Sequence, residues 1–218
     1  MLLILVVAFW NMRFRFAAAS LVLPLLFAQT STGPTIPKLN DANPEIVNLV
    51  AQDQWDRGDD FFGSQQAPPK DKIDWDKVNK RDEQRRDAVR KLLTEGTLQT
   101  GKDYRFAALI FQHSQDSAGY LLAHVLAVTA VGKGEPKARW LAAATMDRYL
   151  MSLKQPQVFG TQFHQDSGAW TMDPYDRGAF SDAIRASWCV ASQSEQEQIL
   201  KDIRDGKPFR STYVAACK

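Results

Sequence analysis

Histidine and cysteine are scarce in this chain, which has three histidines and two cysteines among 218 residues. There is no Cys-x-x-Cys pair and no His-Glu-x-x-His segment, so neither a thiolate zinc site, a dithiol redox motif nor a helical zinc motif is indicated. No Gly-x-Ser-x-Gly segment or phosphate-binding glycine loop supports nucleophilic or phosphoryl-transfer chemistry. The histidines also lack the i,i+4 spacing of metal motifs, and we expect no metal and no cofactor.

Acidic side chains are absent from the first 28 residues, whose only charges are Arg13 and Arg15. The arginines precede the apolar run Phe16–Phe27, which is followed by small or polar residues. This order is typical of secretory signal peptides. The apolar runs on either side of the arginines have about 10–12 residues each, too few to span a bilayer. We therefore expect residues 1–30 to be a signal peptide; the alternative is an uncleaved membrane anchor.

The order of the basic and apolar segments also indicates that translation starts at Met12 and that cleavage falls between Ala28 and Thr32. Removing the signal peptide leaves 25 basic and 25 acidic residues. A balanced domain lacks the basic footprint of a nucleic-acid-binding protein. We expect a periplasmic or secreted protein without stable membrane insertion after cleavage. Its expected partner is an extracytoplasmic protein, a peptide or an envelope component, and not a nucleic acid.

The two cysteines, Cys189 and Cys217, both lie in the last 30 residues of the chain. An oxidising compartment would allow one disulfide between them. The alternative is a buried, apolar Cys189 and an unpaired Cys217. Sequence spacing leaves both open, because a disulfide depends on the separation of the two Cα atoms.

Helical periodicity predominates after a flexible leader at residues 31–43, which is rich in Thr, Pro, Ser and Asn. It predicts one mainly α-helical (all-α) domain over residues 44–218, with about six to seven helices and one long irregular loop at 155–175. Asp103 is expected to cap a helix, and Ser194 with Glu197 to form a capping box. The expected helices are 44–57, 75–95, 104–113, 117–131, 136–153, 179–190 and 194–206.

Small residues recur along three consecutive predicted helices and would let these helices approach closely. They are Ala107, Ala108, Ala123, Ala127, Ala130, Ala138, Ala142 and Ala143. Ala108 and Ala142 are 34 residues apart, and Pro136 stands where a tetratricopeptide repeat has its closing proline. A tetratricopeptide-like hairpin is therefore expected. An extended solenoid is not, because there is no second copy of the repeat.

Several polar residues occupy positions that packing alone does not explain. Asp82 and Arg86 have i,i+4 spacing, which predicts an ion pair facing the core. His113 and His164 each lie at the end of an element beside polar neighbours, whereas His124 is expected to be a core or edge histidine with one hydrogen bond.

Asp147 and Arg148 lie inside a predicted helix and point about 100° apart, so they cannot pair with each other on its surface. At least one should reach another element. The loop 157–162 is the expected target, because its irregular backbone needs hydrogen-bond partners.

These elements follow one another in a characteristic order. They are Asp82 and Arg86, Gln112-His113, Asp147-Arg148, and the segment Pro156-Gln-Val-Phe-Gly-Thr-Gln162. The order resembles an uncharacterised bacterial family, a domain of unknown function often found in exported proteins. The resemblance covers residues 78–164; Glu83 and Phe159 depart from the family's commoner Gln and Tyr. It implies no particular chemistry, because the family has no established activity.

Two functions are compatible with this sequence. The first is a non-catalytic module that binds a peptide, envelope component or protein in a groove between helices. The second is a hydrolase-like enzyme with Asp, His and Arg in acid–base and anion-stabilising roles. The candidate polar cluster is Asp82, Arg86, His113, Asp147, Arg148, Gln157, Gly160, Thr161, Gln162 and His164.

Overall fold

The computed structural model describes residues 39, 41–59, 61–62, 73–208 and 212. All of them belong to one compact unit of the chain, Thr32–Lys218. The expected signal peptide (residues 1–30), the start at Met12 and the cleavage site lie outside the described residues. None of the helices that are described is long and apolar enough to cross a membrane.

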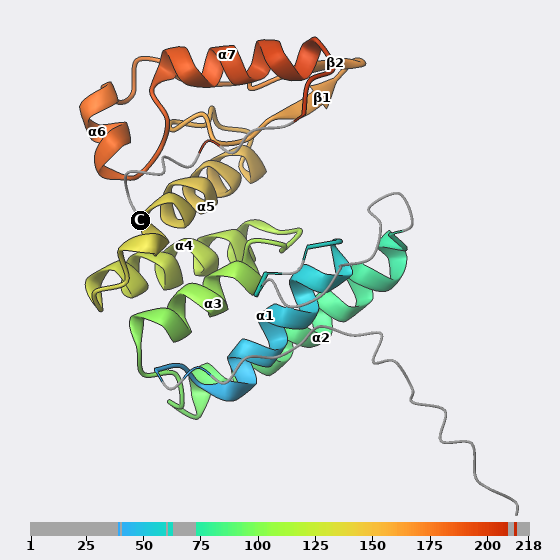
Figure 1. Ribbon diagram of the computed structural model, residues 1–218, viewed down its shortest axis with the longest axis vertical. Coiled ribbons are helices and arrows are strands. Elements are labelled where there is room, and N and C mark those ends of the chain that lie inside the picture. Colours follow the sequence, from blue (N-terminus) through green and yellow to red (C-terminus); the bar gives the residue numbers. More distant parts are fainter. Residues whose placement is uncertain (1–38, 40, 60, 63–72, 209–211, 213–218) are drawn as a thin grey trace, which may run out of the picture. The chain divides into compact units, whose positions relative to one another are not determined.

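The described part of the chain is mainly helical, as predicted, with seven α-helices, one short 3₁₀ helix and one two-stranded sheet (Figure 1). The α-helices are α1 (Pro44–Asp56), α2 (Trp75–Thr94), α3 (Gly101–Phe111), α4 (Ser117–Gly132), α5 (Arg139–Ser152), α6 (Asp182–Ser187) and α7 (Gln193–Arg204). The 3₁₀ helix η2 (Pro136–Ala138) leads into α5, and strands β1 (His164–Asp166) and β2 (Ala169–Thr171) form an antiparallel hairpin.

The main core lies between α1, α3, α4 and α5. Helix α4 packs extensively on both α3 and α5, and α1 packs on α3. The alanines predicted to allow close helix approach are all buried, with at most 1 % of their surface exposed. Phe106, Phe111 and Ile46 supply the bulk of this core. Close packing through alanine is therefore confirmed, and the tetratricopeptide-like character of the hairpin stays a prediction.

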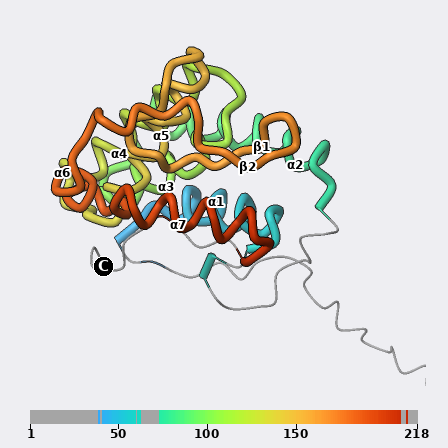
Figure 2. Tube along the Cα trace, turned by 90° about the horizontal axis from the view of Figure 1, so that it is seen from above, coloured from blue at the N-terminus to red at the C-terminus, as the bar shows by residue number. Residues whose placement is uncertain are grey.

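The C-terminal elements form a further layer over α5. Figure 1 shows the loop between α5 and α6 lying between α5 and α7. Seen from above, α6 and the β1–β2 hairpin lie at opposite ends of α7 (Figure 2). Phe159 packs with Ala143 and Val190, and Met172 packs with Tyr175 and Leu200. Two small apolar clusters thus join the loop to the helices on either side of it.

Three helices begin at residues other than predicted because their N-caps differ. Thr100, not Asp103, caps α3, and Asp103 is the third helical residue, whose side chain closes the capping box. The N-cap of the last helix likewise lies two residues earlier than expected, with Ser192 and Glu195 forming the capping box. Helix α6 is shorter than predicted, because Ser181 caps it. In each case another hydroxyl lies where it can accept the helix N–H group.

Candidate functional site

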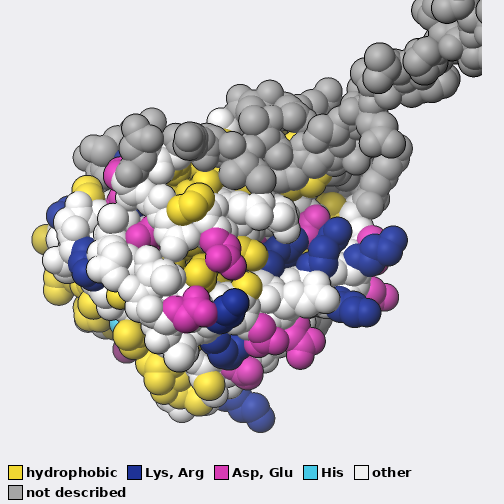
Figure 3. Space-filling model, turned by 90° about the horizontal axis from the view of Figure 1, so that it is seen from below, with side chains coloured by type: hydrophobic (Ala, Val, Ile, Leu, Met, Phe, Trp, Pro, Cys, Tyr) yellow, Lys and Arg dark blue, Asp and Glu magenta, His cyan; other side chains and the backbone are white. Residues whose placement is uncertain are grey.

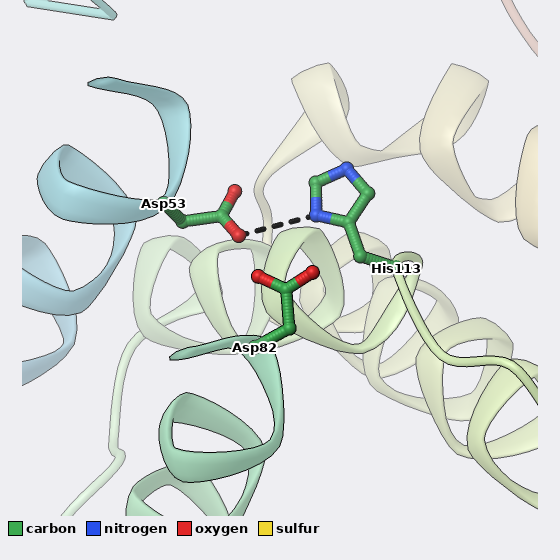
Figure 4. A group of neighbouring side chains, drawn as sticks. All are labelled: Asp53, Asp82 and His113. Atoms are coloured by element: carbon green, nitrogen blue, oxygen red, sulfur yellow. Dashed lines mark hydrogen bonds and ion pairs between the residues drawn. The ribbon is translucent and has the colours of Figure 1, made fainter. Parts of the chain in front are cut away.

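A cluster of ionisable side chains joins the end of α1 to α2 and to the end of α3. Asp53 lies on α1, Asp82 on α2 and His113 just after α3, and Figure 4 shows their side chains pointing toward one another. Asp53 and Asp82 are buried, with 1 % and 3 % of their surface exposed. The His113 Nδ1 atom lies 3.2 Å from Asp53 Oδ1, and the second ring nitrogen points away from both carboxylates (Figure 4).

Two arginines lie between these carboxylates. Arg57, which follows α1, donates to Asp53 Oδ1 at 2.8 Å and to Asp82 Oδ2 at 2.5 Å. Arg85, which is 4 % exposed, donates to the other oxygen of Asp82 at 2.9 Å and also pairs with Asp56. Buried charges are tolerated when they are paired and hydrogen-bonded in this way.

The predicted pair between Asp82 and Arg86 is wrong. Asp82 pairs at i,i+3 with Arg85, and Arg86 instead donates to the His113 carbonyl oxygen at 3.3 Å. Consecutive helical residues point about 100° apart, so only one of the two arginines can face α1. Arg85 takes that position because Asp56 and the Gln52 carbonyl oxygen on α1 are its further acceptors.

Charge pairing also sets the ionisation of Asp53. Burial alone would raise the pKa of its carboxyl, but His113 and Arg57 together hold that pKa below its usual value of 3.8. The carboxylate form is therefore favoured, and with it the ion pairs to α2 and α3.

Asp53, Asp82 and His113 are also the set of described side chains whose ligand atoms, all within 4.8 Å of one another, could hold a metal ion. Their carboxylate oxygens already accept hydrogen bonds from Arg57 and Arg85. A cation would have to displace a guanidinium group to reach them. The donor set is thus better suited to arginine than to a metal.

Asp147 does what the sequence predicted: it ties α5 to the loop 157–162. It is fully buried and accepts four hydrogen bonds, from the backbone N–H groups of Val158, Phe159 and Thr161 at 2.8–2.9 Å and from the Thr161 hydroxyl at 2.7 Å. Burial raises the pKa of the Asp147 carboxyl, and these hydrogen bonds oppose that rise. Because all four contacts are made to the loop, the role of Asp147 is structural.

The other face of the loop is held by residues that the sequence analysis did not identify. Arg185 on α6 and Gln196 on α7 are both fully buried. Each donates to the Phe159 carbonyl oxygen at 2.6 Å. The Tyr175 hydroxyl donates to Gln196 Oε1 at 3.1 Å. No short-range pattern links these residues, so the sequence alone does not indicate them.

Gln157 closes the loop on itself. Its side chain accepts from the Gln162 N–H group at 3.0 Å and donates to the Gln162 carbonyl oxygen at 3.0 Å. Between them, Gly160 has a φ of 70°, and a Cβ atom there would lie 2.7 Å from both Gln196 Oε1 and the Tyr175 ring. Gly160 is therefore required both by its backbone conformation and by close packing.

Gly160→Ala is accordingly expected to lower the free energy of unfolding by about 2–4 kcal/mol, from backbone strain and overpacking together. Gly168 is the matched control, because its φ is 85° but no atom lies within 4 Å of the position of its Cβ. Gly168→Ala should cost only the conformational strain, about 1–2 kcal/mol. Urea unfolding of both variants measures the difference, and equal losses would contradict the packing argument.

Arg148 does not join the Asp147 network. It lines a cavity of about 560 Å³ between α5, the loop and the end of α7. Thr161 and Gln162 also line this cavity, and Gln162 donates to the Thr161 hydroxyl oxygen at 2.9 Å. The remaining lining residues are Trp140, Phe163, Trp170, Ile203, Gly206 and Lys207. Three members of the predicted cluster thus meet at one cavity.

The remaining predicted residues are separate. His164 lies on β1, and its buried Nδ1 atom has no hydrogen-bond partner among the described residues. His124 has the single hydrogen bond expected of it, to the Ala142 carbonyl oxygen at 2.9 Å. Cys189 is buried and disulfide-bonded. Its expected partner, Cys217, lies outside the described residues, so that pairing stays a prediction.

The predicted polar cluster is therefore divided into an ion-pair cluster around Asp82 and His113, a loop tie at Asp147, and the cavity beside Arg148. Asp53 and Arg57 were missed, although Asp53-x-x-Asp-Arg57 on one helix could have been read as a charged face turned inward. In comparisons with known proteins, no family model matches the chain, and neither a curated protein nor a solved structure is significantly similar to it. The resemblance to the uncharacterised bacterial family stays a prediction.

Proposed function

We propose that this protein is an exported, non-catalytic binding domain whose ligand occupies the cavity beside Arg148. The observation that carries the proposal is that some polar groups bond only within the fold, whereas others line the cavity. Asp82 and Asp147 bond to groups within the fold, whereas the cavity combines polar side chains with an aromatic wall. Its volume of about 560 Å³ lies in the range of small-molecule and short-peptide sites.

A second cavity, of about 290 Å³, lies between α4, α5 and α6 and is lined by apolar side chains and His124. Charged groups are absent from its lining residues. The first cavity is the better candidate, because a few convergent polar groups are what orient a ligand and give specificity.

The hydrolase-like alternative rests on one observation, the contact between His113 and Asp53. A buried carboxylate that orients a histidine is common in acid–base catalysis. Here, however, Arg57 binds the same Asp53 oxygen at 2.8 Å, and His113 does not line the cavity. The pair therefore fits an ion-pair cluster better than a general base.

The two functions differ in what happens to small molecules offered to the protein. Purified protein is incubated with a small-molecule extract of bacterial cells, and retained and consumed compounds are identified by mass spectrometry. We expect retention without consumption, lost in Ile203→Trp, which fills the cavity. Val125→Trp is the control, because Val125 is half exposed on α4. Consumption abolished by His113→Ala would favour the enzyme, and retention unaffected by Ile203→Trp would contradict the proposed site.

A further inference from the structure

Arg148 differs from Arg57, Arg85 and Arg185 in what surrounds its guanidinium group. Arg57 contacts two aspartates, Arg85 contacts three, and Arg185 contacts the Phe159 carbonyl oxygen and Asp182. Arg148 makes no ion pair with any described residue, and its Nε atom is buried without a hydrogen-bond partner there. Among these four arginines, Arg148 is therefore the one without an ion pair to a described residue.

The surroundings make this charge costly. Burial lowers the pKa of Arg148; the Tyr120 hydroxyl opposes that effect, and nearby Arg57 adds to it. Arg148 is thus a half-buried cation beside another cation, with the Tyr120 hydroxyl as its polar partner. It lacks, among the described residues, the counterion that charges withdrawn from water normally have. An anion beside Arg148 would supply it.

The lining of the cavity fits such a ligand. It contains no aspartate or glutamate, and its second cation, Lys207, is paired with Asp202 at 2.9 Å. The wall is formed largely by aromatic and aliphatic side chains. The Trp140 ring nitrogen already donates to the Thr212 hydroxyl at 2.9 Å. The indole therefore offers the cavity apolar surface.

We propose that the cavity binds an oxyanion, a carboxylate or a phosphate group, at Arg148, with an aromatic or apolar body of the same ligand against Trp140 and Trp170. This inference rests on the proposed binding function and names its ligand class. A guanidinium group binds either oxyanion through two parallel hydrogen bonds, and the tryptophan faces provide contact area at little entropic cost.

The test uses three probes with the same ring. 3-Phenylpropionate and phenyl phosphate carry the two anions, and 3-phenylpropionamide is the neutral counterpart. Calorimetric titration of the purified full chain should show at least one anion binding about tenfold or more tightly than the amide. The anion that binds more tightly identifies the ligand's anionic group as a carboxylate or a phosphate. In Arg148→Met that preference should vanish, and in Arg148→Lys it should be reduced, because lysine retains charge without the two-pronged geometry.

Arg139→Met is the matched control, since Arg139 lies exposed on the same helix and should leave binding unchanged. Melting temperature without ligand is a second readout. Arg148→Met should melt no lower than the wild type, because it removes a half-buried charge that has no counterion among the described residues. A fall of more than about 5 °C would show that Arg148 is a structural tie and would overturn the inference.

Two other outcomes separate this inference from the proposed function. The amide and the anions could bind equally well, with binding unaffected by Arg148→Met but lost in Ile203→Trp. That result would support the binding cavity and overturn the proposed ligand class. Failure of all three probes up to about 10 mM would overturn the ligand class, because it implies affinity below about 3 kcal/mol. If the extract also gave no cavity-dependent retention, the proposed function would fail with it.

Discussion

Replacing Asp147 by alanine is expected to lower the free energy of unfolding by about 3–5 kcal/mol. The carboxylate accepts from three backbone N–H groups and one hydroxyl, all belonging to the loop 157–162. Alanine leaves these donors without acceptors, and the walls formed by Arg185 and Gln196 limit how far the loop can move toward water. The cost is therefore that of several unsatisfied buried groups and not of one lost contact.

Equilibrium unfolding in urea and amide hydrogen exchange together test this expectation. Exchange at Val158, Phe159 and Thr161 should become fast in Asp147→Ala, because these amides lose their acceptor. Asp147→Asn should show an intermediate loss, because an amide retains one acceptor oxygen. Asp166→Ala is the control: Asp166 is exposed, and its side chain contacts only Ser167 among the described hydrogen bonds. If Asp147→Ala lowered the free energy of unfolding by less than about 1 kcal/mol, that result would contradict the role of Asp147 in holding the loop on α5.

The helices could be predicted because their signals are local. Proline at the first position of α1, the glycine after α2 and the alanine spacing in α3, α4 and α5 lie within a few residues of the feature they determine. The position of Asp147 could also be inferred, because a polar residue on a buried helix next to an irregular loop has few other uses. Errors arose where two equivalent residues lay close together, as with the capping hydroxyls and with Arg85 and Arg86.

The composition of the site depends on contacts between residues far apart in the sequence. Gln196 reaches the Phe159 carbonyl oxygen across 37 positions, and His113 reaches Asp53 across 60. Neither contact has a periodic signal. The charge distribution has no sequence signal either: the whole chain has a formal net charge of only +2, and Figure 3 shows basic and acidic side chains mixed on the face it presents. That Arg148 has no ion pair among the described residues becomes apparent only when its neighbours are known.

The structure also changes the roles assigned to the polar residues. The sequence predicts one cluster of ten polar residues. In the structure, most of these residues instead hold the loop 157–162 or pair α1 with α2. The loop in turn forms one wall of the cavity through Thr161 and Gln162. Asp147 and Gln157 are therefore positioning residues for the cavity, and variants there should change ligand binding only in proportion to the loss of loop order.

The ion-pair cluster should show the second large effect. Asp82→Ala is expected to destabilise the protein by about 3–5 kcal/mol, because it leaves Arg57 and Arg85 buried with fewer acceptors. Arg57→Met should also destabilise it, by exposing the repulsion between Asp53 and Asp82. The double variant removes one positive and one negative charge together, so its loss should be smaller than the sum by about 1–3 kcal/mol.

A double-mutant cycle in urea measures this coupling directly. The matched cycle uses Asp87 and Arg90 on the same helix, which form an exposed pair at 3.5 Å. That pair should show coupling below about 0.5 kcal/mol, because solvent screens it. Additive losses for Asp82 and Arg57 would mean that their contact, at 2.5 Å, contributes no more than a surface pair does. Strong coupling would show instead that charges that neutralise one another hold α1 and α2 together.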